Sequence, residues 1–585
     1  MAYAAFHIQD PDFRDRGCRP VFHDTDGSPV YEGPYHCLLY EILRRDDVAA
    51  IHQYHACRRI IHRHFELDHD NPFHIAVKHR SFQVLRVLIE IYPEDRAAAA
   101  QHLRSRGEEE GPWVETVQEY LSRNHVSLVH EACKAADREF LGWLMAQKPP
   151  LGTLSGRDYL GRMALLSAAI GLGDANREGL WEDVMELDPD QEKAWEQQEQ
   201  ARRGRHEVFI RSLLEQEGCC SVQESDWMLP TIDGTWAPDT QEAEMTLMST
   251  VLGAAIPRAS YDMTMQLIAQ GASPYASQSW GTHVSSLKYE MGYTTDVTPL
   301  HIASLYWNAD AIRALMDCCR ADDSQSPAEM VARADSRGRL PLHWALTRDR
   351  GVSRRMLLDT VALLLEANPE TVNVPNHRGA SAVSQAIETH ANSGGSLVPL
   401  LKLLLAHGVD ARVCDSKGRN ILHQLARASW QPSSLDPDLL NRLLEQVGVN
   451  EPAAADGSTA LHYLVRHLNQ IDAARHLIQC GANANAINHQ GNTPLHEVMR
   501  GVVRPRVDST TGQLEPMPSE HLAQSLDAFI QVLVEAGASM DQLNAAGKTP
   551  TQVRDEVTES REMIRREREV QQLRMRGRGR GRGRG

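Results

Sequence analysis

One short motif recurs along this chain and constrains its fold more than any other feature. The clearest copy is Thr493-Pro494-Leu495-His496, which follows a glycine two residues earlier. Self-similarity at a spacing of tens of residues is the signature of a repeat protein, in which each unit buries its apolar face only against its neighbours. The other clear copies each end in Leu-His and are Thr298–His301, Leu340–His343, Asn420–His423 and Thr459–His462.

The spacing of these histidines supports a regular array. His462 and His496 are 34 residues apart, and His423 and His462 are 39 apart. The 42 residues between His301 and His343 predict a loop insertion in that repeat. Weaker copies extend the array in both directions and are Asn71–Ala76, Ser127–Ala132, Gly161–Leu166, a helix pair that ends at Gly271-Ala272, Gly379–Ser384 and Gly547–Pro550.

Each residue type in the motif has a physical reason. Proline in the first helical turn has a suitable φ and loses only an N–H that would be unpaired there. The threonine before it can cap the helix, and the histidine is expected to join that threonine to neighbouring backbone. A glycine such as Gly271, Gly408 or Gly481 is expected to end the second helix in the left-handed conformation. Asp or Asn followed by Gly then predicts a turn into the next repeat.

These elements closely resemble the ankyrin-repeat family, whose T-P-L-H-x-A and G-A-x-x-N patterns they match almost letter for letter. The resemblance implies an all-α solenoid of about ten to eleven helix-turn-helix repeats with turn fingers. It also implies a non-enzymatic scaffold or adaptor. Such a protein binds a protein partner through its turn tips and the exposed faces of its first helices, which line a concave groove.

Departures from the repeat register suggest domain boundaries. Insertions in repeat proteins often carry binding specificity, and a loop without a function is the alternative for each of them. The expected divisions are an irregular segment over 1–34, N-terminal repeats over 35–171, an acidic helical and loop insertion over 172–245, C-terminal repeats over 246–555 with a Pro/Ser/Thr-rich loop at 503–520, and a charged helix with an Arg-Gly tail over 556–585.

Charge is unevenly distributed along the chain. The net charge is −17, but Arg561 to Gly585 contains ten Arg and three Glu and carries +7, which leaves −24 for the rest. An acidic body argues against general nucleic-acid binding by the repeats. The ten scattered cysteines form no C-x-x-C pair, so we expect reduced thiols in the cytosol or nucleus. We expect neither a membrane span nor a secretory signal.

Basic residues nevertheless gather where the resemblance places partner contacts, and Glu388 is the exception. Aligned cations in an acidic body predict a groove for an acidic partner, because charge complementarity sets association rate and specificity. A solvated helix face is the alternative. Trp344 and Tyr306 are candidate aromatic anchors, although Trp344 packed inside the repeats is equally compatible with the sequence. The candidate partner-binding residues are Arg337, Arg339, Arg378, Lys417, Arg419 and Lys548 at the turns, and Arg348, Arg427, Arg466 and Arg500 on the first helices.

The chain ends in alternating arginine and glycine. This tract cannot bury a core and is expected to be disordered. It resembles the RG-rich tails of RNA-associated proteins, so an RNA-associated protein whose repeats tether a protein partner is the alternative function. A solubilising tail is the other interpretation. The candidate residues for RNA contact or methylation are Arg576, Arg578, Arg580, Arg582 and Arg584.

Sequence motifs for catalysis are absent. No Gly-x-Ser-x-Gly, His-Glu-x-x-His or Rossmann glycine pattern occurs. Gly547-Lys548-Thr549 resembles the end of a phosphate-binding loop, but Gln542 stands where that loop needs glycine. We therefore predict no enzyme, no small-molecule substrate and no cofactor. A cryptic activity in residues 172–245 is the remaining enzymatic alternative.

Histidines suggest two places to consider a metal. Those of the repeat motif occupy equivalent positions in successive repeats, so they are predicted to be structural and not to converge on one ion. A denser group contains potential zinc ligands, but a structural zinc site usually draws paired ligands from two segments, and a polar helix face is the expected interpretation. This group is His52, His55, Cys57, His62 and His64.

Overall fold

The computed structural model forms two compact units, each described here by itself. Unit 1 comprises Met1–Asp174, Gln198–Ala259 and Gln266–Ser273, and unit 2 comprises Ala175–Gln197, Ser260–Met265 and Pro274–Gly585. The residues that the structure describes are 21–23, 29–32, 40, 42–58, 72–105, 116–123, 126–148, 150–158, 161–173, 189–216, 222, 225–228, 247–280, 294–321, 326–347, 354–390, 397–428, 435–502, 519–560 and 563.

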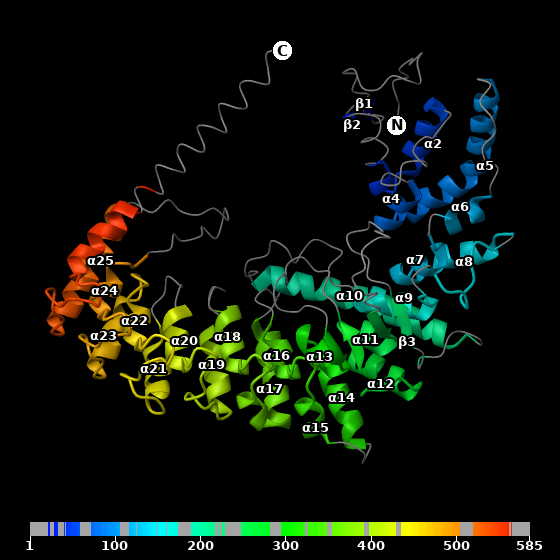
Figure 1. Cartoon of the computed structure of the whole chain (residues 1–585). Helices are drawn as coiled ribbons and strands as arrows, with labels where there is room; N and C mark the ends of the chain where they lie inside the picture. The colour runs from blue at the N-terminus through cyan, green and yellow to red at the C-terminus, as the bar shows by residue number, and fades with distance from the viewer. Residues whose placement is uncertain are drawn as a thin grey trace, which may run out of the picture. The chain divides into compact units, whose positions relative to one another are not determined.

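Unit 1 is mainly helical, and its neighbouring helices pack against each other, α7 on α9 and α9 on α11 (Figure 1). Helices α10 (Pro189–Leu214) and α12 (Tyr261–Ala269) have residues in both units. The other helices of unit 1 are α2 (Val48–Arg58), α4 (Pro72–Lys78), α5 (Phe82–Ser105), α6 (Val117–Arg123), α7 (Leu128–Ala135), α8 (Arg138–Ala146), α9 (Ala164–Gly173) and α11 (Val251–Ala255).

Helix α10 lies within the segment predicted to be an acidic insertion. Its C-terminal half is fixed to unit 1 through Arg202, whose guanidinium donates to the carbonyl oxygens of Gly171 and Leu172 at 3.0 and 2.9 Å. These carbonyls belong to the last turn of α9, where they have no intrahelical partner. Residues 174–188, 217–221, 223–224 and 229–245 of this segment lie outside the described residues.

Short antiparallel hairpins interrupt the helices, a difference from the all-α prediction. Each pair has too few residues to show the alternating pattern that marks a strand in a sequence. The pairs are β1 (Val21–His23) with β2 (Pro29–Glu32), β3 (Ser225–Met228) with β4 (Leu247–Thr250), and β5 (Gln278–Trp280) with β6 (Thr294–Val297).

Unit 2 contains helices that stand side by side in chain order (Figure 1). Its described C-terminal part continues as helix over residues 550–560. The helices of unit 2 are α13 (Pro299–Leu305), α14 (Ala309–Ala321), α15 (Pro327–Ala332), α16 (Pro341–Ala345), α17 (Arg354–Ala367), the 3-10 turn Pro369–Asn373, α18 (Ala382–His390), α19 (Leu397–Ala406), α20 (Ile421–Ala428), α21 (Pro437–Leu444), α22 (Ala460–Leu464), α23 (Ile471–Gln479), α24 (Pro494–Val498) and α25 (Ser519–Glu535).

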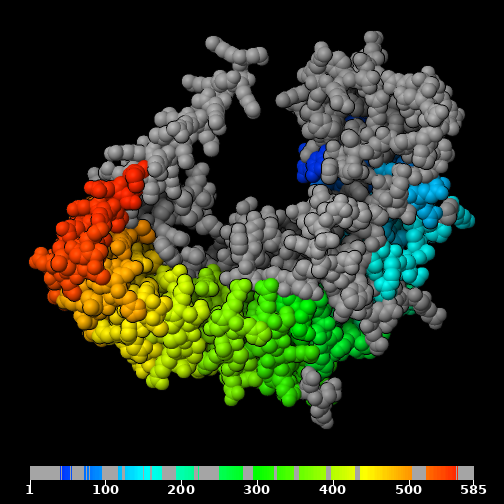
Figure 2. Space-filling model, viewed as in Figure 1, coloured from blue at the N-terminus to red at the C-terminus, as the bar shows by residue number. Residues whose placement is uncertain are grey.

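The helices of unit 2 form two layers. The first helices, which carry the motif, contact one another in the order α13, α16, α18, α20, α22 and α24, and second helices such as α14, α17, α19 and α21 also contact in order. The core lies between the layers, where Leu300, Leu342 and Leu461 are at most 1% exposed. Side chains fill the spaces between these helices on the face shown, in the stretch coloured green to orange (Figure 2).

Local sequence explains where these helices begin and end. The N–H of Thr493 donates to His496 Nδ1 at 3.1 Å, with Pro494 at the first helical position, as the motif predicts. The second helices end at glycines with positive φ, +85° at Gly408 and +93° at Gly481, which confirms their predicted role. A side chain other than glycine would be strained in that conformation.

Candidate partner-binding surface

The motif histidines join one repeat to the next. His301 Nδ1 is 2.8 Å from Thr298 Oγ1, and its Nε2 is 3.1 Å from the carbonyl oxygen of Arg339 in the following repeat. A carbonyl can only accept, so Nε2 carries the proton and Nδ1 accepts. The equivalent Nε2 contacts are His130 to Gly156, His343 to Ala380, His423 to Glu451, His462 to Asn492 and His496 to Lys548.

Burial keeps these rings neutral. It lowers the pKa of His343 to about 4, and it lowers the pKa of His130, His423, His462 and His496 below the ordinary value. A neutral imidazole has one donor and one acceptor, which is what this link between repeats requires. The prediction that these histidines are structural is confirmed where the structure describes them, and the side chain of His74 lies outside the described residues.

The turns before the first helices are organised by an Asp or Asn side chain. In one turn, Asp335 Oδ1 accepts the backbone N–H groups of Arg337 and Arg339 at 2.9 and 2.8 Å, and Gly338 has a φ of +73°. The other oxygen, Asp335 Oδ2, accepts from Arg339 Nε at 2.8 Å and from Trp344 Nε1 at 2.9 Å. The Arg339 guanidinium also lies 5.1 Å from the centre of the Trp344 ring.

Two of the predicted partner-binding arginines are therefore used inside their own turns. Arg339 is only 7% exposed, and Arg419 is only 8% exposed with its Nε 2.7 Å from Asp415 Oδ2. Trp344 is fully buried, so it packs inside the repeats and is not an exposed anchor. Sequence reasoning missed these pairs, although the spacing Asp-x-x-Gly-Arg could have revealed them.

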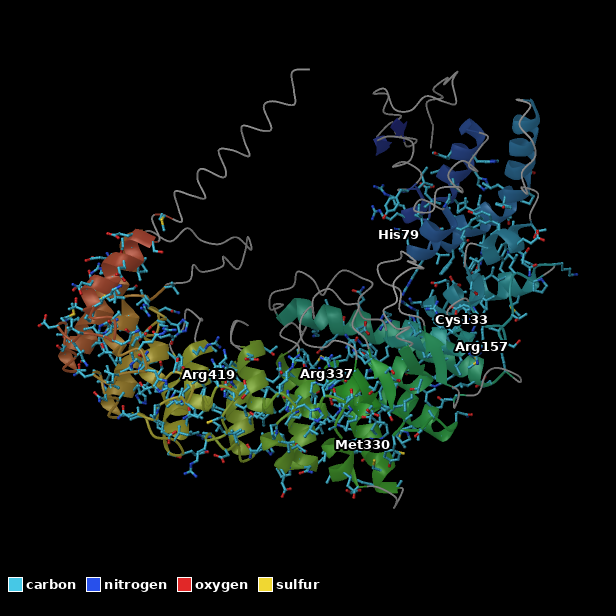
Figure 3. The ribbon with its side chains drawn as sticks, viewed as in Figure 1. His79, Cys133, Arg157, Met330, Arg337 and Arg419 are labelled. Atoms are coloured by element: carbon cyan, nitrogen blue, oxygen red, sulfur yellow. The ribbon has the colours of Figure 1, made fainter. Side chains whose placement is uncertain are left out.

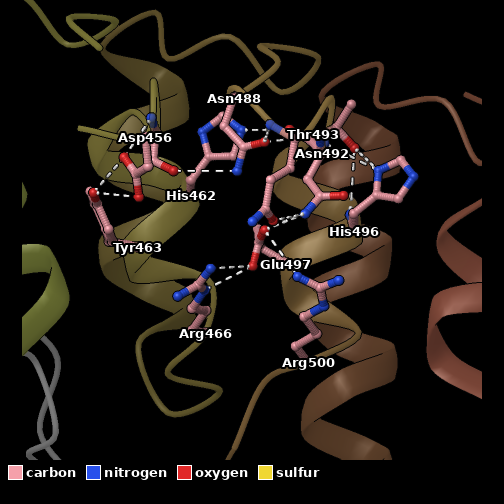
Figure 4. Close-up of polar contacts among 12 residues, drawn as sticks. Asp456, His462, Tyr463, Arg466, Asn488, Asn492, Thr493, His496, Glu497 and Arg500 are labelled. Atoms are coloured by element: carbon pink, nitrogen blue, oxygen red, sulfur yellow. Dashed lines mark hydrogen bonds and ion pairs between the residues drawn. The ribbon is translucent and has the colours of Figure 1, made fainter. Parts of the chain in front are cut away.

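A buried carboxylate lies close to two further arginines (Figure 4). Glu497 on α24 is fully buried and accepts from Arg466 Nε of α22 at 2.8 Å and from Asn492 Nδ2 at 2.9 Å. Arg500 Nη1 lies 3.8 Å from the same carboxylate. Nearby, the Tyr463 hydroxyl donates to both oxygens of Asp456 at 2.8 and 2.9 Å. Arg466 and Arg500 are partly exposed, and both lie against this one carboxylate, to which Arg466 is the closer.

The remaining candidates divide into two groups. Lys548 is ion-paired with Glu556, and Arg337 is half-buried at its turn. In contrast, Arg378, Lys417 and Arg427 are exposed, and no carboxylate among the described residues lies within ion-pair distance of them. We call these three residues the exposed basic set.

Two of the turns lie at a common edge of unit 2. Arg337 and Arg419, which mark two of the turns, lie along the same edge of the row (Figure 3). Glu388, the acidic exception among these positions, is exposed on α18. Arg348 and the tail residues Arg576, Arg578, Arg580, Arg582 and Arg584 lie outside the described residues.

Nothing in the described ranges gathers metal ligands. No three or more His, Cys, Asp or Glu side chains there are grouped so that they could hold a metal ion. In the histidine-rich group, His52 is exposed and His55 half-buried, while the side chain of Cys57 and residues His62 and His64 lie outside the described part. In the same described ranges, each helix is too short or too polar to span a bilayer.

A family model for the ankyrin repeat matches residues 456–489. The match begins at the turn that holds Asp456 and ends in the following turn at His489. It therefore covers one repeat, which consists of helices α22 and α23. The chain contains an ankyrin repeat at these residues. Ankyrin repeats are generally protein–protein interaction modules, and proteins of the family are typically non-enzymatic scaffolds.

The ankyrin-repeat chain is also similar to a solved structure. This is the ankyrin repeat domain of Bcl-3, described as a unique member of the IkappaB protein family. The identity is 21%, the similarity covers 44% of this chain and 93% of that chain, and the TM-score is 0.31.

Proposed function

We propose that this protein is a non-enzymatic scaffold whose repeats, about ten to eleven in number, stack as a solenoid and bind a protein partner that carries an acidic segment. The exposed basic set is the observation that supports this function. Arg378 and Lys417 occupy the same position in consecutive turns, and Arg427 lies in the last turn of the first helix of the second of these repeats.

Paired and exposed cations differ in how much a partner gains by binding them. Arg339, Arg419 and Arg466 already balance carboxylates of their own repeats, so a partner gains little from them. An exposed cation without such a pair can approach an acidic group at a small desolvation cost. In a chain of net charge −17, such cations would orient an acidic partner and speed its association.

Charge reversal tests this function. In the triple variant Arg378→Glu, Lys417→Glu and Arg427→Glu, we expect at least about tenfold weaker partner capture at moderate salt, because three attractions become repulsions. Affinity capture with mass spectrometry identifies the partner of the natural chain, and titration of that partner measures the loss. The natural complex should also weaken as salt is raised.

A matched control reverses Arg442 and Arg475, which lie on the second-layer helices α21 and α23 and are exposed. This double variant should retain the partner. Equal binding by the triple variant and the natural chain would refute a role for the exposed basic set.

The Arg-Gly tail supports a second candidate function, contact with RNA, because arginine attracts phosphate and stacks on bases. A chain that ends at Met575 should lose most of the RNA crosslinking seen with the full chain. A variant with lysine in place of the five tail arginines separates charge from guanidinium stacking, and it should recover only part of the signal. Undiminished crosslinking after truncation would contradict this function.

A further inference from the structure

Successive turns of unit 2 are tied together by backbone hydrogen bonds. An N–H near the tip of one turn donates to a carbonyl oxygen of the turn before it. One junction lacks this bond: the Ser416 N–H and the Arg378 carbonyl are not joined, although the structure describes both turns completely. The bonds present are Ser336 to Thr295, His377 to Arg337, Ala455 to Lys417, His489 to Asp456 and Ala545 to Gln490, at 2.8 to 3.1 Å.

The same junction lacks the histidine link. Ser384 stands where the motif has histidine, and its hydroxyl lies 3.2 Å from Ser381 Oγ within its own repeat. No described hydrogen bond runs from the Ser384 side chain to the following repeat. On either side of this junction the link is present, from His343 to Ala380 and from His423 to Glu451.

The two turns at this junction also approach each other less closely at the glycine. At Gly379, φ is +76° and a Cβ atom would meet nothing within 4 Å. A Cβ atom at Gly338 or Gly418 would instead lie 2.5 or 2.3 Å, respectively, from a side chain of the following turn. The next turn therefore covers those two glycines and leaves Gly379 open.

Apolar side chains of the two repeats meet in the core at the same place. Val383 and Leu404 come from one repeat, and Ile421, Leu439 and Leu443 come from the other.

Other contacts still hold the junction closed. Gln446 accepts the Ala411 N–H at 2.9 Å through its side chain and Arg412 Nε at 3.0 Å through its carbonyl. Lys402 of α19 also forms an ion pair with Asp436 at the start of α21, and helix α18 packs on α20 and α19 on α21. The junction is therefore formed, but without the turn bond and the histidine link that the junctions on either side of it have.

We propose that the boundary between α18/α19 and α20/α21 is a joint at which the repeat array opens. Stability in a repeat protein is approximately a sum of repeat and interface contributions, so the weakest interface decides where cooperative blocks separate. The joint stands independently of the proposed function. It separates the turns of Arg378 and Lys417, so its opening changes the distance between those two cations.

Hydrogen exchange on the full chain tests the joint without any partner. Short helices persist only through tertiary contacts, so opening exposes their amides. We expect the amides of α18 and α20 to exchange about tenfold faster than those of α22 and α24, as the loss of one to two net hydrogen bonds implies. Equal exchange in the two pairs of helices would overturn the joint.

The variant Ser384→His supplies the missing link. A histidine that follows a serine by three residues already makes this link elsewhere in the chain. His130 Nδ1 is 2.6 Å from Ser127 Oγ, and its Nε2 is 3.1 Å from the carbonyl oxygen of Gly156. Exchange in α18 and α20 should slow by about fivefold to tenfold. Unchanged exchange in the folded variant would contradict the proposal.

The reciprocal variant His423→Ser should transfer the weakness to the next junction. It removes the 2.8 Å bond to the Glu451 carbonyl, so exchange in α20 and α22 should rise by about tenfold. This change requires no new side chain to fit. If it leaves exchange unaltered, the histidine links do not control opening, and the proposal fails.

Discussion

Replacing Asp335 with alanine is expected to lower the free energy of unfolding by about 3–5 kcal/mol, because it leaves a buried guanidinium without its carboxylate. The Asp335 side chain is fully buried, and that of Arg339 is 9% exposed. The variant also removes the acceptor of the Trp344 indole N–H. Urea unfolding followed by circular dichroism measures the loss.

The pH dependence follows from the same contacts. Burial alone would raise the pKa of Asp335, but the charge and hydrogen bonds of Arg339, with the bonds from Trp344 and Arg337, hold the pKa below its ordinary value. The stabilisation is therefore present at neutral pH and is lost as pH falls through the folded pKa. The difference in the free energy of unfolding between the natural chain and the Asp335→Ala variant should therefore decrease in acid.

A second substitution identifies the cause of this loss. Adding Arg339→Leu to Asp335→Ala removes the unpaired charge and should recover at least about 1 kcal/mol. For comparison, Asp310→Ala breaks an ion pair with Arg313 whose side chains are 43% and 49% exposed, and it should cost less than about 1 kcal/mol. A double variant no more stable than Asp335→Ala would show that the buried charge is not responsible.

Replacing Gly171 with alanine should destabilise unit 1 by about 2 kcal/mol or more. A Cβ atom at this position would lie 1.9 Å from the Lys134 carbonyl oxygen at the end of α7. Because the obstacle is backbone, no rotamer change relieves it, and α7 and α9 must separate. The cost exceeds the gain of about 1 kcal/mol that alanine brings to a helix. The midpoint of thermal or urea unfolding reports the result.

Two other helical glycines provide matched controls. Gly142 in α8 and Gly204 in α10 are exposed, and a Cβ atom at either would meet nothing within 4 Å. Alanine there should leave stability unchanged or raise it by up to about 1 kcal/mol. Stabilisation by Gly171→Ala similar to that of the controls would show that close helix approach is not required.

The sequence predicted the helix starts and ends because a few adjacent residues determine them. Pro494 and Thr493 set one helix start, and Gly408 and Gly481 end helices in the left-handed conformation as expected. The all-α prediction was incomplete. Strands β5 and β6 are separated in the sequence by residues 281–293, and no local pattern indicated that they pair.

The candidate surface was less predictable. Ten basic positions could be found by aligning the repeats, but their availability depends on what each side chain meets. The carboxylate that balances Arg466 belongs to Glu497, 31 residues later in the next repeat. An alignment of the repeats does not show which arginine of a neighbouring repeat such a carboxylate contacts.

The sequence by itself therefore determined that the chain contains ankyrin repeats and where the helices that carry the motif begin. Those features depend on backbone preferences and hydrogen bonds within a few residues. Only the tertiary structure decided that Arg466 is balanced from the next repeat while Arg378, Lys417 and Arg427 are exposed. It also decided that the junction after Ser384 lacks two links, because burial and bonds between repeats depend on how neighbouring repeats stack.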